Sequence, residues 1–187
     1  MALSAIVHRA NLSFSDLDRN RYCDHSLTIA RHPSETEERM MVRLLAFVLN
    51  APDNNDEGAL ELGKDLWEAD EPALIQKDLT GLTVHWIEVG QPEEKKIQRV
   101  CSRSRRVSVY AYSSTAEAWW SEMAGRMTRF QNLTVWQVPA GQSQALAQLA
   151  SRSMNLNITI QDEAIWIEEG DQSVEVSLVP LAGSRGG

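Results

Sequence analysis

Residues 83–100, "TVHWIEVGQPEEKKIQRV", contain the transition that decides the fold, from an apolar strand to a charged helix. In residues 82–89 the side chains alternate between two faces, and large apolar groups occur on both. Such a strand is typical of the centre of a sheet that is covered on both sides. Gln91 and Pro92 then begin a helix that we expect to run to about Ser102, because proline and early carboxylates favour a helix start.

The strand ends in a carboxylate, Glu88, which loses hydration in a buried position unless a cation or a proton compensates. The helix after it supplies cations, several of them four residues apart on one face. This basic patch consists of Lys95, Lys96, Arg99, Arg103, Arg105 and Arg106. Two interpretations stay open: Glu88 belongs to a functional site, or it is a strand-end acid that only binds the basic helix.

Two further acids, Asp70 and Glu71, come directly before the preceding strand, residues 72–78. The strands at 72–78 and 82–89 are separated by one tight turn, so hairpin pairing brings these acids toward Glu88. Two carboxylates and a lysine at strand ends suit Mg²⁺, which takes hard oxygen ligands and polarises phosphoryl oxygens. His85, inside the strand, is interpreted as a core histidine and not as a metal ligand.

The rest of the chain alternates strands and helices. A capping box at Ser34 and Glu37 opens a helix that ends before the loop at 50–58. Residues 59–69 permit either a strand or a short helix. Further strands are expected at 3–14, 21–33, 106–113 and 133–139, further helices at 114–127 and 141–153, and hairpin strands near the carboxyl end. This order predicts parallel strands with helical crossovers.

The composition is that of one intracellular domain. The 187 residues carry a net charge of −8, and the two cysteines, Cys23 and Cys101, are isolated, so neither a disulfide framework nor a cysteine metal site is expected. No apolar run is long enough for a membrane span, and we expect a cytoplasmic protein. The predicted parts of the single domain 1–187 are an N-terminal hairpin (1–33), a core (34–153), a C-terminal hairpin (154–182) and a tail (183–187).

The order helix, three strands, helix, strand resembles the core of the PD-(D/E)XK nuclease superfamily. The chain also resembles the bacterial YaeQ family over almost its whole length. The stretches that carry this resemblance are "DLDRN" (16–20), "LTIARHPSETEERMMVRLLAF" (27–47), "DEPALI" (70–75), "WIEVGQPEEKKI" (86–97), "WW" (119–120), "TIQD" (159–162) and "IW" (165–166). The resemblance implies an α/β fold with a restriction-endonuclease-like core, a central mixed sheet flanked by helices, and extra β-hairpins at both ends.

Carried over position by position, the nuclease motif makes Asp70 its aspartate, with Glu71 as an alternative, and Glu88 its second acid. Its lysine falls at position 90, where this chain has Gly90. The resemblance therefore implies that Lys95 or Lys96 replaces that lysine, with Gln91 near the site. A further metal ligand on the first helix would be Glu38 or Glu37. The implied cofactor is Mg²⁺, with Mn²⁺ as a substitute.

These residues give three hypotheses about function. The first is a metal-dependent phosphodiesterase that acts on nucleic acid, with Arg99, Arg103, Arg105 and Arg106 positioning the phosphate backbone. The alternative is a catalytically inactive, nuclease-like protein that binds nucleic acid or a protein partner, which the glycine at the motif lysine favours. A third hypothesis is a structural or interaction protein that is nuclease-like by descent only. The acidic balance excludes a generally basic nucleic-acid-binding protein, so any such binding depends on local clustering.

Overall fold

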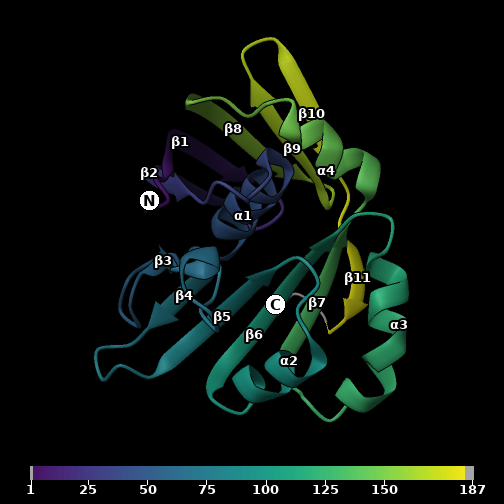
Figure 1. Cartoon of the computed structure of the whole chain (residues 1–187). Coiled ribbons are helices and arrows are strands. Elements are labelled where there is room, and N and C mark those ends of the chain that lie inside the picture. Colours follow the sequence, from purple (N-terminus) through teal and green to yellow (C-terminus); the bar gives the residue numbers. More distant parts are fainter. Residues whose placement is uncertain (1, 184–187) are drawn as a thin grey trace.

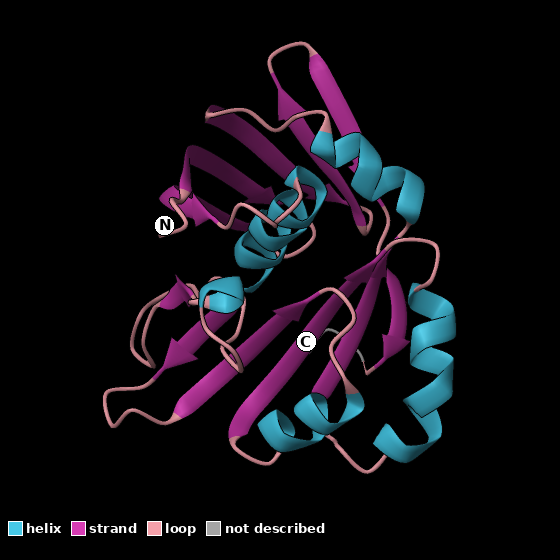
Figure 2. Cartoon of the chain, in the orientation of Figure 1, coloured by secondary structure: helices cyan, strands magenta, loops and turns pink. Residues whose placement is uncertain are grey.

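The computed structural model describes residues 2–183 as two β-sheets and four α-helices (Figures 1 and 2). The helices are α1 (Glu37–Asn50), α2 (Glu94–Cys101), α3 (Ala116–Met127) and α4 (Ala140–Ala147), with a 3₁₀ turn at Asp65–Trp67. The strands are β1 (Ile6–Asp16), β2 (Arg21–Arg31), β3 (Leu60–Leu62), β4 (Leu74–Lys77), β5 (Thr83–Val89), β6 (Ser104–Tyr112), β7 (Leu133–Val138), β8 (Ser153–Gln161), β9 (Ala164–Glu169), β10 (Gln172–Val176) and β11 (Val179–Ala182). The predicted mixed α/β class is confirmed.

The first sheet joins the two ends of the chain. Its order is β10-β9-β8-β1-β2, and β1 pairs in parallel with β8, so that Leu12 lies opposite Leu156. We expected separate N- and C-terminal hairpins, but their strands form one sheet. Along β1 and β8 buried and exposed residues alternate, since one face packs on the core and the other faces solvent.

The second sheet has the order β11-β7-β6-β5-β4-β3, and β5, β6 and β7 are parallel. This is the predicted central mixed sheet, and β5 is buried on both faces as its composition indicated. The position of β11 differs from the prediction. It leaves the C-terminal hairpin and pairs antiparallel with β7, which ties the end of the described chain to the second sheet.

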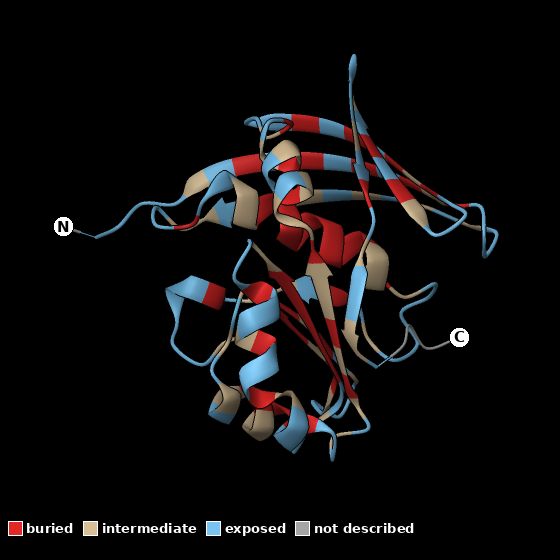
Figure 3. Ribbon diagram, turned by 90° about the vertical axis from the view of Figure 1, so that its right-hand side faces the viewer, coloured by how far each residue is buried: buried red, intermediate tan, exposed pale blue. Residues whose placement is uncertain are grey.

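Helix α1 lies between the two sheets (Figure 1), and the nine consecutive residues from Met40 to Val48 are buried. A helix buried on all sides needs apolar residues around its whole circumference, and α1 has them. Figure 3 shows this buried layer inside the molecule. The helix begins later than predicted: Thr36 is its N-cap and accepts from the Arg39 amide at 3.1 Å. The predicted capping box at Ser34 is wrong, because Ser34 instead contacts the ring of His32.

Helices α2 and α3 cover the opposite face of the second sheet, where they form a separate apolar cluster. That face presents Val107, Val109 and Val135 to the helices. The ambiguous segment 59–69 contains both predicted kinds of structure, a short strand and then a 3₁₀ turn. In the stretch 2–183, none of the helices has the length and apolar character needed to cross a membrane.

Candidate functional site

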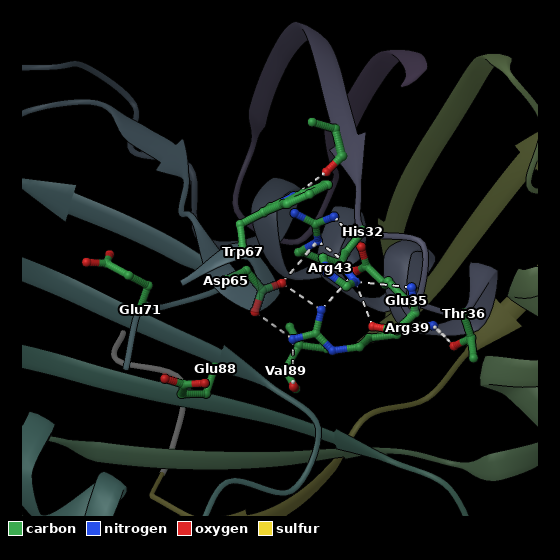
Figure 4. A network of polar contacts seen from close by, with 12 residues as sticks. His32, Glu35, Thr36, Arg39, Arg43, Asp65, Trp67, Glu71, Glu88 and Val89 are labelled. Atoms are coloured by element: carbon green, nitrogen blue, oxygen red, sulfur yellow. Dashed lines mark hydrogen bonds and ion pairs between the residues drawn. The ribbon is translucent and has the colours of Figure 1, made fainter. Parts of the chain in front are cut away.

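A cleft of about 520 Å³ opens at the carboxyl end of β5. Figure 4 shows Glu71 and Glu88 of its lining beside the polar network around Arg39. In sheets with parallel strands this edge is where ligands usually bind. The cleft is formed by α1, by the 3₁₀ turn and the segment before β4, and by the start of α2. The residues that line it are Arg39, Asp65, Leu66, Glu68, Ala69, Asp70, Glu71, Glu88, Val89, Gly90, Gln91, Pro92 and Lys96.

Glu88 and Lys96 form an ion pair in this cleft. Lys96 Nζ lies 2.9 Å from Glu88 Oε1, and the indole N–H of Trp86 donates to the same oxygen at 2.7 Å. The Glu88 side chain is 6% exposed and that of Lys96 is 23% exposed. The Lys96 ammonium also donates to the backbone carbonyl of Glu71 at 3.4 Å. A single ammonium group therefore connects the end of β5 with the segment that precedes β4.

Burial raises the pKa of the Glu88 carboxyl above its ordinary value, and Lys96 only partly offsets this. Hydrogen bonds from Lys96 and Trp86 also lower the pKa of Glu88, whereas the negative charge of Asp65 raises it. Loss of hydration disfavours the ionised form of a buried acid, whereas the ion pair with Lys96 favours that form. Groups with shifted pKa values in a cleft are typical of functional sites.

Gly90 has a backbone conformation that disfavours a lysine, or any other side chain, at this position. Its backbone has a φ of +109°, a conformation that side chains with a Cβ rarely adopt. Its N–H donates to the Tyr110 carbonyl on β6 at 2.9 Å, which fixes the chain as it leaves β5. A lysine at position 90 would be strained, whereas Lys96, near the start of α2, brings its amine to Glu88 without strain.

The two acids expected beside Glu88 lie in the cleft, but neither side chain contacts it. Asp70, which has a positive φ of 64°, is exposed and accepts from Arg99 at 2.6 Å. Glu71 approaches the ion pair through its backbone carbonyl. The predicted convergence is therefore observed for Glu88 and Lys96, while Asp70 lies at the rim.

A buried network of charges adjoins the cleft. Asp65, in the 3₁₀ turn, accepts two hydrogen bonds from the Arg39 guanidinium, at 2.6 and 2.8 Å. Glu35 accepts from Arg39 at 2.9 Å and from Arg43 at 3.1 and 2.7 Å. Arg39 also donates to the Val89 carbonyl at 3.3 Å, so the network holds the end of β5 against α1.

Comparison with known proteins gives the family. The family model described as YaeQ protein matches residues 1–178. This chain belongs to the YaeQ family.

Relatives and solved structures agree with this assignment over nearly the whole chain. Proteins named "Uncharacterized protein YaeQ" from Salmonella typhi and Escherichia coli K12 are 41% and 39% identical over 180 residues, which is 95% of this chain and 96% of each relative. The crystal structure of YaeQ from Xanthomonas axonopodis pv. citri matches with a TM-score of 0.90 at 41% identity, covering 97% of this chain and all of that one. The YaeQ structure from Pseudomonas syringae gives 0.88 at 35% identity, with 97% and 98% covered.

The sequence analysis of this YaeQ-family protein did not identify the residues of the buried charge network. Asp65 lies in the segment whose secondary structure the sequence left open, so its direction was not predictable. The sequence did carry a usable signal in the spacing of Glu35, Arg39 and Arg43. Residues four apart lie on one side of a helix, and here that side continues into the segment just before α1. An acid and two arginines at that spacing, next to an apolar helix, indicate a buried ion network.

The other predicted site residues lie outside the contact between Glu88 and Lys96. Gln91 lies at the cleft, but its amide donates to Ser113 at 3.2 Å and Thr115 at 2.8 Å. Lys95 is exposed and lines a different surface of α2. Glu38 accepts from Ser143 on α4 at 2.6 Å, and neither it nor Glu37 lines the cleft. These positions correct the expectation that Lys95 and Glu38 belong to the site.

The four arginines expected to bind nucleic acid do not form one patch. Arg99 pairs with Asp70, and Arg105 pairs with Glu57 at 2.6 Å. Arg105 and Arg106 are consecutive in a strand and point to opposite faces of the sheet. Arg103, beyond the end of α2, is exposed. The expected continuous basic patch is therefore corrected to separate cations.

The cleft contains carboxylate oxygens that can bind a metal, but these oxygens do not form a preformed coordination site. Across residues 2–183, no three histidine, cysteine, aspartate or glutamate side chains are close enough to hold an ion together. Mg²⁺ is commonly held by only one or two carboxylates and several waters. Glu88, with Asp70 or Glu71, fits that requirement in chemistry, while both Asp65 oxygens are engaged by Arg39.

Proposed function

We propose that this YaeQ-family protein is a metal-dependent phosphodiesterase that acts on nucleic acid, with a site of the PD-(D/E)XK type. The observation that carries the proposal is the contact of 2.9 Å between the buried Glu88 carboxylate and Lys96 in a cleft at the end of β5. An acid on a central strand and a lysine beside it are the last two members of that motif. Here the lysine comes from the following helix.

Each member of the pair has a distinct role in phosphodiester hydrolysis. The Lys96 ammonium, partly exposed to the cleft, stabilises the negative charge that develops on a phosphoryl oxygen in the transition state. Glu88 holds that ammonium in place through Oε1, and its second oxygen, Oε2, would be the metal ligand. Trp86 donates to Oε1 and thereby fixes the orientation of the carboxylate. Mg²⁺ or Mn²⁺, held by Glu88 with Asp70 or Glu71, would supply Lewis acidity and an activated water.

The charge of the cleft supports the requirement for a cation. Five carboxylates line it, against two cationic side chains, Arg39 and Lys96. A phosphodiester is itself an anion, so it is repelled by this surplus unless a bound cation compensates. The proposal therefore predicts that nucleic acid enters the cleft only when a divalent metal is present.

A cleavage assay tests the proposal. The purified protein is incubated with single- and double-stranded DNA and RNA and with Mg²⁺ or Mn²⁺. Glu88→Gln is expected to lower the rate by about 100-fold, comparable with the loss of one electrostatic group in other active sites. The matched control is Glu168→Gln, an exposed glutamate in a second "WIE" segment at 166–168. Lys96→Met is likewise compared with Lys95→Met. Equal cleavage by Glu88→Gln and the parent protein would contradict the proposal.

The alternative is a protein that binds nucleic acid or a protein partner without cleaving it. One observation favours it: Asp70, the expected motif aspartate, is already engaged by Arg99, and Asp65 of the same cleft is engaged by Arg39. Salt-dependent binding of DNA or RNA, with no cleavage in any metal, would support this second function. Calorimetric titration with Mg²⁺ separates the two, because only the phosphodiesterase requires metal binding that Glu88→Gln removes.

A further inference from the structure

A second cavity, of about 810 Å³, lies on the face of the second sheet turned away from α2 and α3. It is enclosed by the turn between β1 and β2, the loop after α1, and strands β5, β6 and β7. It shares no lining residue with the cleft at Glu88. Its volume falls in the range of sites for small molecules, roughly 300–1,000 Å³.

The floor of this cavity is a row of polar side chains on three neighbouring strands. His85 Nε2 lies 2.8 Å from Ser108 Oγ, which lies 3.1 Å from Thr134 Oγ1. Thr134 in turn donates to the Val107 carbonyl at 3.3 Å. His85 and Ser108 are buried, at 2% and 4% exposure, which is unusual for polar groups that serve only packing.

The direction of these hydrogen bonds determines which tautomer His85 adopts. A carbonyl only accepts, so the Thr134 hydroxyl uses its proton on Val107 and accepts from Ser108. Ser108 then accepts from the Nε2–H of His85, and the lone pair is on Nδ1. In the part of the chain that the structure describes, His85 Nδ1 is buried and has no hydrogen-bond partner. A buried acceptor without a donor is costly, and this nitrogen has almost no surface that a ligand or a water could reach.

The histidine stays neutral in this setting. Burial, and to a lesser degree the positive charge of Arg106, lower the pKa of His85 from its ordinary value to about 3. At neutral pH the ring therefore adds no positive charge to the cavity, and the cations of its lining are the arginines.

The charge of the cavity is opposite to that of the protein. Three arginines and one acid, Asp53, line it, whereas the whole chain carries −8. Asp53 is already paired with Arg21 at 2.5 Å. Arg19 and Arg106 are exposed, and no carboxylate in residues 2–183 forms an ion pair with either of them. Guanidinium groups that are free to form bidentate hydrogen bonds bind phosphate and carboxylate well.

We propose that this cavity binds a small organic anion, which presents a phosphate or carboxylate to Arg19 and Arg106. The ligand spans the distance from the arginines to the polar floor of β5 to β7. This binding site is independent of the cleft at Glu88 and of any cleavage there.

Amide NMR spectra of the ¹⁵N-labelled protein test the proposal. The full chain is titrated separately with AMP, with citrate and with adenosine, which represent a phosphate, a carboxylate and an uncharged relative of AMP. AMP, citrate or both are expected to shift the amide signals of Arg106, Ser108 and Thr134, and adenosine is expected to bind at least tenfold more weakly than AMP. The anion that shifts these signals identifies the acidic group.

Variants locate the two contacts. Arg106→Gln is expected to weaken anion binding at least tenfold, whereas Arg105→Gln, the adjacent arginine on the other face of β6, leaves it unchanged. Arg19→Gln, at the second arginine without an ion pair, also weakens AMP binding, whereas Glu88→Gln has no effect. The proposal is overturned if neither anion shifts these amides, if adenosine binds as well as AMP, or if the two arginine variants behave alike.

Discussion

Replacing Lys96 by methionine removes the ammonium group but keeps an unbranched side chain of similar size. The variant leaves the Glu88 carboxylate, 6% exposed, without its cation. At the observed 2.9 Å and an effective dielectric constant of about 20, the direct attraction is about 6 kcal/mol. Because Lys96 regains hydration on unfolding and is itself partly exposed, we expect a net loss of about 3 kcal/mol of unfolding free energy at pH 8.

The loss is expected to depend on pH in a defined direction. Burial already raises the pKa of Glu88, and removal of Lys96 raises it further. An acid whose pKa is raised in the folded state destabilises that state at pH values above the pKa that the acid has in the unfolded chain. Lowering the pH through the raised pKa toward the ordinary carboxyl range therefore restores stability, and the loss falls to about 1 kcal/mol at pH 5.

Urea unfolding at several pH values, followed by fluorescence, measures these losses. Lys95→Met is the control, since that side chain is exposed and has no role in the pair. The double variant Glu88→Gln/Lys96→Met should recover to within about 1 kcal/mol of the parent, because it removes both charges together. A loss below about 1 kcal/mol at pH 8, or one that is the same at pH 5, would refute the claim that Lys96 favours the ionised form of Glu88.

Three other perturbations have expected outcomes in the same unfolding assay. Glu35→Ala should cost about 3–5 kcal/mol, because it leaves the buried Arg43 with only its longer contact of 3.8 Å to Asp65; a loss below about 1 kcal/mol would contradict a buried network. Gly90→Ala should cost about 1–3 kcal/mol through backbone strain alone, since no atom lies near its added Cβ, whereas Gly125→Ala, inside a helix and also unobstructed, should stabilise by about 0.5–1 kcal/mol. The lowered pKa of His85, about 3 against an ordinary 6.5, means that below neutral pH the unfolded chain binds a proton that the folded chain does not; stability should therefore fall by about 2 kcal/mol more between pH 7 and 5 than in His85→Gln, and equal slopes would contradict it.

The contact between Glu88 and Lys96 was predictable because both residues belong to one local unit. Strand alternation identified β5 as central, and the turn after it fixed where α2 begins. A lysine at the start of that helix is then within reach of the strand end. The sequence did not distinguish Lys96 from Lys95, since the choice depends on a helix rotation set by how Ile97 and Val100 pack on the sheet.

The features that were not predictable depend on contacts between distant segments. Asp65 reaches Arg39 on α1 from a 3₁₀ turn in which its own backbone has a positive φ of 50°. No local sequence pattern indicates that conformation for an aspartate. Asp70 looked like a partner of Glu88 because the hairpin brings the two segments together. Its own positive φ and the nearby Arg99 turn it outward instead.

The parallel pairing of β1 with β8 has a consequence for how the protein is made. The contact of 2.8 Å between His8 and Ser151 joins residues separated by 143 positions, and contacts of such long range form slowly. During synthesis on the ribosome, β1, β2 and α1 emerge long before β8. Until β8 is made, the apolar side of α1 that packs against it is exposed. The nascent chain therefore passes through a stage in which chaperones and proteases have access to the segment that is most deeply buried in the finished molecule.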